Sequence, residues 1–127
     1  MVLDASAAVR TLVADENGRR MRARIAVTES HAPHVFDAEV GQALRRHARQ
    51  GALDPAVALD ALREVCGLVD HRYSHLGLLS GAWALRHNLS FYDALYASLA
   101  AELGMPLVTS DIRLARAPSL PCTVELV

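Results

Sequence analysis

Four acidic residues in this chain are spaced so that they could bind a divalent cation together: Asp4, Glu39, Asp93 and Asp111. Carboxylates brought close together repel one another, and the chain contains no lysine to neutralise them. Carboxylate oxygens are hard ligands that suit Mg²⁺ or Mn²⁺. Magnesium is commonly held by a few carboxylates together with substrate phosphate. The four residues therefore point to chemistry on a phosphodiester or a phosphoryl group.

Each acid also has a structural explanation. Asp4 and Asp111 could cap the helices expected to follow them. Asp93 comes three residues after Ser90, which is the spacing of a capping box. Glu39 could be an acid favoured near a helix N-terminus. Taken singly, none of the four requires a functional role.

Two details favour a functional role. Glu39 follows Phe36 by three residues and precedes Ala43 by four, so its side chain should share the apolar face of a helix. A carboxylate on such a face is costly unless it is paired or binds a cation. Asp93 lies in the segment FYDALYASLAAELG, which is apolar almost all round and should be mostly buried.

These residues must be positioned by short strands that alternate with helices. The apolar runs and stop signals predict strands at Val2-Leu3, His34-Val35, Leu68-Val69, Met105–Val108 and Cys122–Leu126. Helices are expected over Ala5–Val13, Arg19–Glu29, Phe36 to Gln50, Pro55 to Cys66, Ser74–Arg86, Ser90–Leu103 and Ile112–Arg116, with Asn17-Gly18 as a turn.

This alternation indicates an α/β domain with a parallel sheet covered on both faces. In such a sheet ligands bind beyond the carboxyl ends of the strands. Asp4 and Asp111 each follow an expected strand, so both should lie at that edge. At 127 residues the chain fits one domain over its whole length.

The chain resembles the PIN domains, and in particular the VapC toxins of bacterial toxin–antitoxin pairs. The resemblance rests on VLDASAAV, on PHVFDAEVGQALRR around Glu39, and on LSFYDALYASLAAELGMPLVTSD, which contains Asp93 and Asp111. It implies a three-layer α/β/α fold with a central, mainly parallel sheet of four to five short strands. It also implies an Mg²⁺- or Mn²⁺-dependent endoribonuclease that leaves a 5′-phosphate and a 3′-hydroxyl. Asp4, Glu39, Asp93 and Asp111 would be the catalytic and metal-binding acids, and Ser6 and Thr109 the supporting hydroxyls, with Ser110 as an alternative to Thr109.

The expected partners are RNA, a cognate antitoxin that covers the acidic cleft, and a second copy of the chain. The net charge is only −1, but all 13 basic residues are arginine. Arg45, Arg46 and Arg49 fall on the helix expected to carry Glu39, where they could guide RNA phosphates. The apolar helices around residues 55–66 and 75–86 could form a homodimer. With no apolar run near the roughly 20 residues of a membrane helix and no secretory leader, a soluble cytoplasmic protein is expected.

Two other functions are compatible with these residues. The chain could be a catalytically silent PIN-fold binding module, although its complete acidic set argues against a degraded site. It could also be a metal-dependent phosphatase. The segment Asp4-Ala5-Ser6 lacks the second aspartate of the Asp-x-Asp found in haloacid-dehalogenase-type phosphatases, and the chain has no lysine to assist such a reaction.

Overall fold

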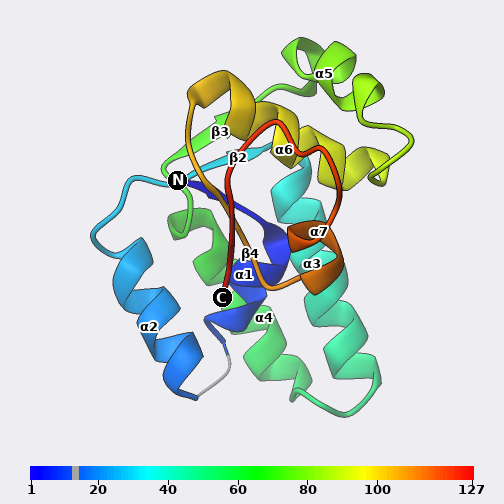
Figure 1. Ribbon diagram of the computed structural model, residues 1–127. Helices are drawn as coiled ribbons and strands as arrows, with labels where there is room; N and C mark the ends of the chain where they lie inside the picture. Colours follow the sequence, from blue (N-terminus) through cyan, green and yellow to red (C-terminus); the bar gives the residue numbers. More distant parts are fainter. Residues whose placement is uncertain (13–14) are drawn as a thin grey trace.

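The computed structural model describes residues 1–12 and 15–127. Its helices and strands alternate along the chain as an α/β domain (Figure 1). In chain order they are β1 (Val2–Leu3), α1 (Ala5–Arg10), α2 (Glu16–Ile25), β2 (His31–Pro33), α3 (Val35–Arg49), α4 (Pro55–Glu64), η1 (Val65–Gly67), β3 (His71–Tyr73), η2 (His75–Gly77), α5 (Leu79–Ala84), α6 (Phe91–Leu103), β4 (Leu107–Thr109), α7 (Ile112–Ala115) and β5 (Val124–Leu126).

The strands form one parallel sheet in the order β3-β2-β1-β4-β5. The three middle strands are buried, and the two edge strands are partly exposed. β1 pairs with both of its neighbours, with Val2 opposite His31 on one side and opposite Leu107 on the other. The parallel sheet expected from the sequence is confirmed, with five strands.

Helices cover both faces of this sheet. On one face α6 packs against β1, β2 and β4, and α5 packs on the outside of α6 (Figure 1). On the other face α1 and α3 contact the sheet, with α2 and α4 packed behind them. The chain changes face because the β1-to-β2 and β2-to-β3 crossovers run one way along the sheet, whereas the β3-to-β4 crossover runs back. The three-layer α/β/α arrangement is thus confirmed.

The helix α6 is the most deeply buried in the fold. Every residue from Ala94 to Ala100 is buried, as the apolar segment predicted. Ser90 caps its N-terminus, and Gly104 ends it in a left-handed conformation at φ 62°, which glycine adopts without strain. Despite this apolar character, none of the helices within residues 1–12 and 15–127 is long and apolar enough to cross a membrane.

Two predicted strands are wrong in position. β2 occupies residues 31–33, and Val35 of the expected strand already belongs to α3. Pro33 ends this strand instead of preceding it. β3 occupies residues 71–73, whereas Leu68 and Val69 lie in the connection before it, with Val69 packed in the core. Because β3 is a partly exposed edge strand, its residues do not form an apolar run. The apolar pair Leu68-Val69 just before it was therefore predicted as the strand instead.

Two predicted helices also differ from the structure. α2 begins at Glu16 because the side chain of Asp15 accepts a hydrogen bond from the Gly18 backbone, so the expected Asn17-Gly18 turn is wrong. The helix expected over residues 74–86 is divided into η2 and the short α5. The first helix ends at Arg10, and Val13 of the predicted range lies outside the described residues.

Candidate active site

The candidate site lies where the carboxyl ends of β1 and β4 meet. The chain leaves β1 toward β2 on one side, while β4 lies on the other side, so a crevice opens between the two strands. Asp4 directly follows β1, and its backbone N–H donates to the carbonyl of Val108 at 3.0 Å. Asp111 follows β4 by two residues. Both acids therefore lie at the sheet edge that the sequence predicted.

Asp4 is buried and held by two hydroxyl groups. Its side chain makes no capping hydrogen bond to α1. Instead Ser6 Oγ and Thr109 Oγ1 both donate to Asp4 Oδ2, the second at 2.6 Å. Burial raises the pKa of Asp4, and these two hydrogen bonds oppose that rise. The capping explanation for Asp4 is therefore excluded.

The same hydroxyls join the loops after β1 and β4. Ser6 Oγ accepts a hydrogen bond from the Ser110 backbone at 2.9 Å, and Thr109 Oγ1 accepts one from the Asp111 backbone at 3.0 Å. Ser110 Oγ is buried and has no hydrogen-bond partner within the described part of the chain. The structure thus places Thr109, and not the Ser110 hydroxyl, against Asp4.

Glu39 points from α3 toward the buried side of α6. The hydroxyl of Tyr96, a fully buried residue, donates to Glu39 Oε2 at 2.5 Å. Burial raises the pKa of Glu39 and the charges of Asp4 and Asp93 raise it further, while the Tyr96 hydrogen bond acts against them. Burial and the neighbouring Glu39 also raise the pKa of Tyr96, which keeps its proton for this bond. The apolar spacing around Glu39 thus correctly predicted a carboxylate that is at least partly buried.

Asp93 contacts the residue that caps its helix and also faces the site. Ser90 Oγ accepts from the Asp93 backbone at 3.2 Å and donates to Asp93 Oδ2 at 2.7 Å. The serine half of the expected capping box is therefore present, while the Asp93 carboxylate bonds the Ser90 hydroxyl and not the Ser90 backbone. Asp93 also lines an open hollow of about 440 Å³ together with Glu39 and Asp111. A capping role therefore does not remove this carboxylate from the site.

Asp111 is the acid of the site that forms an ion pair, and its partner is Arg113. Its Oδ1 accepts a hydrogen bond from the backbone of Arg113 at 2.7 Å, which caps α7. The guanidinium of Arg113 donates to Oδ2 at 3.0 Å, and this contact holds the pKa of Asp111 below its usual value. The Arg113 side chain is 93% exposed, so it can leave Asp111 at little cost.

Asp4, Glu39 and Asp93 affect one another electrostatically. After burial, the Asp93 charge raises the pKa of Asp4, and both of these acids raise the pKa of Glu39. Among the side chains that the structure describes, no three acidic, histidine or cysteine groups form a ready-made metal cluster. Each of the four carboxylates instead accepts a hydrogen bond from a donor of this chain. Hard oxygen donors that repel one another nevertheless fit Mg²⁺ or Mn²⁺.

The structure separates some predicted residues from the site and adds others. Arg45, Arg46 and Arg49 do not contact the acids but line a different hollow on α3. Tyr96 and Arg113 belong to the site, although the sequence assigned them no role. A signal existed for Tyr96, since its position three residues after Asp93 lies on the same helix face.

Comparisons with known proteins agree with this geometry. A sequence model of the PIN domain family matches residues 1–120. Ribonuclease VapC1 of Mycobacterium tuberculosis is 44% identical over 99% of this chain and 96% of its own length. VapC ribonuclease Mb0985 of Mycobacterium bovis is 39% identical over 100% of this chain and 98% of its own. Ribonuclease VapC3 of Mycobacterium tuberculosis is 46% identical over 92% of this chain and 86% of its own.

Solved structures show the same fold. The crystal structure of PAE2754 from Pyrobaculum aerophilum superposes with a TM-score of 0.71 at 26% identity, covering 97% of this chain and 81% of that chain. VapBC2 from Rickettsia felis, solved with a DNA fragment from its promoter, contains a chain that superposes with a TM-score of 0.69 at 14% identity. That superposition covers 99% of this chain and 97% of the other.

Proposed function

The chain belongs to the PIN domain family, and from this premise we propose that it is a metal-dependent endoribonuclease, the toxin of a toxin–antitoxin pair. The curated relatives support the ribonuclease assignment, since they carry that name at 39% to 46% identity. The reaction would be hydrolysis of an RNA phosphodiester bond. Water attacks phosphorus, the bond to the 3′ oxygen breaks, and the products carry a 5′-phosphate and a 3′-hydroxyl.

One observation carries the proposal for this chain: three carboxylates, Glu39, Asp93 and Asp111, line one hollow, and the buried carboxylate of Asp4 lies close enough to interact electrostatically with two of them. Asp4 follows β1, Glu39 projects from α3, and Asp93 lies in the first turn of α6. The charge of Asp93 raises the pKa of Asp4, and the charges of Asp4 and Asp93 raise the pKa of Glu39. A fold kept only as a binding scaffold has no need for repelling acids of which one is buried and the others are partly buried. Such groups are costly for stability and cluster at functional sites.

The same residues are suited to hold Mg²⁺ or Mn²⁺. Asp4 and Asp93 would be its direct ligands, with Asp111 joining once Arg113 turns away, and Glu39 would either join them or accept a proton from the attacking water. A bound divalent cation would neutralise the carboxylates, polarise the scissile phosphate and lower the pKa of a water molecule.

The chain's own residues supply orientation and proton transfer. Ser6 and Thr109 fix the Asp4 carboxylate in one orientation through Oδ2. Tyr96 fixes Glu39 in the same way. The raised pKa of Glu39 brings it closer to the operating pH, which suits a residue that accepts a proton from the attacking water.

Two protein partners complete the proposal. A cognate antitoxin would cover the acidic hollow and direct an arginine at its carboxylates. A second copy of the chain would cover apolar side chains that a monomer leaves exposed on α4 or on the η2–α5 segment, including Leu59 at 49% and Trp83 at 61% exposure.

The function is tested by incubating a mixed RNA pool with purified protein in Mn²⁺, Mg²⁺ or EDTA. The wild type is expected to produce discrete fragments only with metal. Asp93→Asn should lose cleavage by at least about a hundredfold, the order of effect seen when a charge-stabilising catalytic group is removed. Asp60→Asn is the matched control because Asp60 is an exposed acid on α4, paired with Arg63.

Three other results would contradict the proposal. Cleavage that persists in EDTA would exclude the metal. Metal binding with intact RNA in every pool would favour the binding module. Hydrolysis of a small phosphomonoester without RNA cleavage would favour the phosphatase.

A further inference from the structure

A second hollow of about 330 Å³ lies on the C-terminal half of α3. It is lined by three arginines and two glutamines, and no acid contributes to its wall. The lining residues are Gln42, Arg45, Arg46, Arg49 and Gln50. The hollow thus presents hydrogen-bond donors and positive charge in a chain whose net charge is only −1.

The three arginines of this hollow are free to bind a ligand. Among the described residues, the side chains of Arg45, Arg46 and Arg49 make no ion pair and no hydrogen bond. Other arginines are committed, such as Arg63 to Asp60 at 2.9 Å and Arg72 to Asp37 at 2.8 Å. Since a guanidinium binds phosphate through paired N–H donors, three uncommitted guanidiniums form a phosphate-binding surface.

This hollow is aligned with the acidic site along one helix. Arg46 follows Glu39 by seven residues, which is close to two helical turns, so both side chains leave α3 on nearly the same face. The rise between them is about 10 Å. Gln42, which also lines the hollow, lies between these two positions on the helix.

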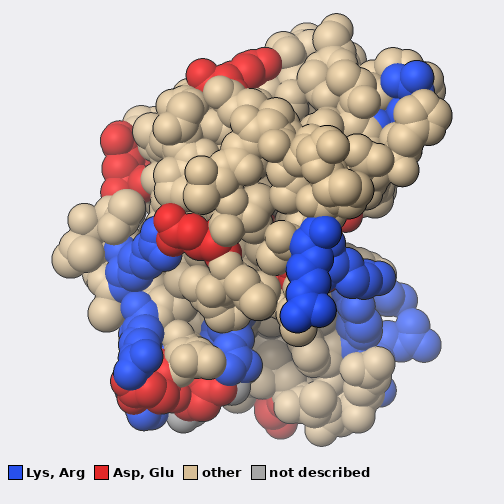
Figure 2. Space-filling view, viewed as in Figure 1, with Lys and Arg blue, Asp and Glu red and all other residues tan. Residues whose placement is uncertain are grey.

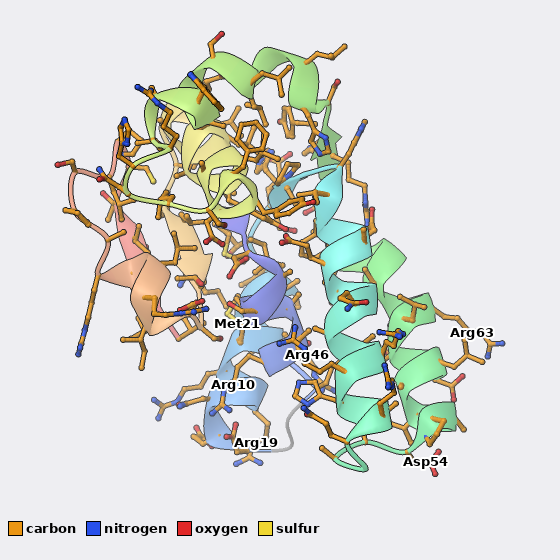
Figure 3. All side chains as sticks on the ribbon, turned by 90° about the vertical axis from the view of Figure 1, so that its right-hand side faces the viewer. Arg10, Arg19, Met21, Arg46, Asp54 and Arg63 are labelled. Atoms are coloured by element: carbon orange, nitrogen blue, oxygen red, sulfur yellow. The ribbon has the colours of Figure 1, made fainter. Side chains whose placement is uncertain are left out.

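The figures agree with this placement. Figure 2 shows blue side chains gathered around α7 and the lower part of α3, on the right of the molecule. In Figure 3 Arg46 lies on the side of α3 that faces α1, while Arg63 points outward from α4 on the opposite side. The cationic surface therefore belongs to the side of α3 that leads to the acids.

We propose that the hollow lined by Arg45, Arg46 and Arg49 is a second phosphate subsite, which binds the backbone of the substrate RNA away from the scissile bond. The inference rests on the proposed ribonuclease function. A strand whose scissile phosphate lies against Glu39 and Asp93 would continue along α3, and a later phosphate would reach Arg46. The substrate must then extend beyond the cleaved bond on this side to be bound well.

The subsite is tested by the salt dependence of RNA binding. A fluorescent single-stranded RNA is titrated with Asp93→Asn protein, which keeps the strand intact, over a series of salt concentrations. Removing all three arginines should weaken binding at least about tenfold and lower the slope of log K against log salt by about 2, since each contact to a single strand contributes roughly 0.7. Arg63→Ala is the matched control and should leave both affinity and slope unchanged.

Cleavage kinetics give a second measurement in the otherwise wild-type chain. Arg46→Ala should raise KM on a long strand, leave kcat unchanged, and have no effect on a dinucleotide too short to reach the hollow. A fall in kcat on the dinucleotide would overturn the subsite and place Arg46 in the chemistry.

The outcomes separate this inference from the proposed function. Metal-dependent cleavage by the wild type, with equal RNA affinity and slope in the triple variant and in Arg63→Ala, would overturn the subsite and leave the ribonuclease intact. Loss of antitoxin binding with unchanged RNA binding would assign the hollow to the protein partner and also overturn it. No RNA binding and no cleavage by the wild type would overturn both.

Discussion

At the scale of single residues, the site depends on how a buried carboxylate is tolerated. Asp4 is only 6% exposed, and burial of the charged form is costly without compensation. Two hydroxyl donors compensate in part, but the pKa of Asp4 stays raised because burial and the charge of Asp93 outweigh them. The charged form is therefore unfavourable in the protein alone, and a cation would stabilise it.

Replacing Thr109 by valine tests this balance at nearly constant volume. The variant loses a hydrogen bond that favours ionised Asp4, so the pKa of Asp4 rises further. Below that pKa the lost bond is to a neutral acid, and the free energy of unfolding should fall by about 1 kcal/mol. Above it the lost bond is to a charged acid, and the fall should reach about 1.5–3 kcal/mol. Urea unfolding in EDTA at a series of pH values measures the difference.

Ser110→Ala is the matched control for that experiment. Its hydroxyl is buried without a described partner, so removing it should leave stability unchanged or slightly higher at every pH. A pH-independent loss in Thr109→Val, or a pH-dependent loss in Ser110→Ala, would show that Thr109 does not hold the charged carboxylate.

At the scale of elements, the short helix α5 is held in place by close packing against α6. This helix has six residues and is attached to the domain through α6. Gly81 lies against buried Ser98, and a Cβ added at this glycine would lie 2.0 Å from Ser98 Oγ and 3.3 Å from Ser98 Cβ. The glycine is therefore explained by close helix approach and not by backbone conformation.

Overpacking in Gly81→Ala is expected to cost about 2–3 kcal/mol of the free energy of unfolding, in the upper part of the usual range because the added Cβ would lie 2.0 Å from Ser98 Oγ. Alanine gains about 1 kcal/mol of helix propensity over glycine, so the net loss should be about 1–2 kcal/mol. The double variant Gly81→Ala/Ser98→Ala should recover most of the stability, because the closest clash is with the serine oxygen. Urea denaturation of the single and double variants measures both effects. A single variant as stable as the wild type would mean that α5 and α6 are not this close.

At the scale of the whole molecule, apolar side chains remain exposed on a protein with an otherwise complete core. On the η2–α5 segment Leu76 is 81%, Leu79 is 42% and Trp83 is 61% exposed. On α4, Val57 and Leu59 are about half exposed, at 54% and 49%. Exposed apolar groups that gather on one element commonly mark a protein interface.

Trp83→Ala is expected to shift the protein from dimer to monomer, since buried tryptophans dominate the energy of many interfaces. Leu59→Ala on α4 should leave the dimer intact. Sedimentation velocity over a range of concentrations measures the association. The reverse result would move the interface to α4, and a monomeric wild type at all concentrations would contradict the homodimer.

The sequence by itself determined the features that local rules control. Helical spacing identified α3 and α6, and with them the partly buried positions of Glu39 and Asp93. The helix expected to begin at Pro55 does begin there, and Asp54 before it accepts hydrogen bonds from two backbone groups. Residues that follow an apolar strand also had to lie at the carboxyl edge of a parallel sheet, which placed Asp4 and Asp111. Each of these patterns spans only a few neighbouring residues, so it can be recognised from the sequence alone.

Only the tertiary structure decided the features that depend on distant segments. Strands of three residues carry too little pattern to be located alone, and pairing with β1 fixed β2 at residues 31–33. The choice of Thr109 over Ser110 depended on a hydrogen bond across 105 positions of the chain, and the partner of Glu39 lay 57 positions away. The sequence also did not show which arginines form ion pairs with acids and which remain free to bind phosphate. The position of β2, these hydrogen bonds and these ion pairs all depend on contacts between segments that are distant in the sequence. Local residue spacing does not determine such contacts.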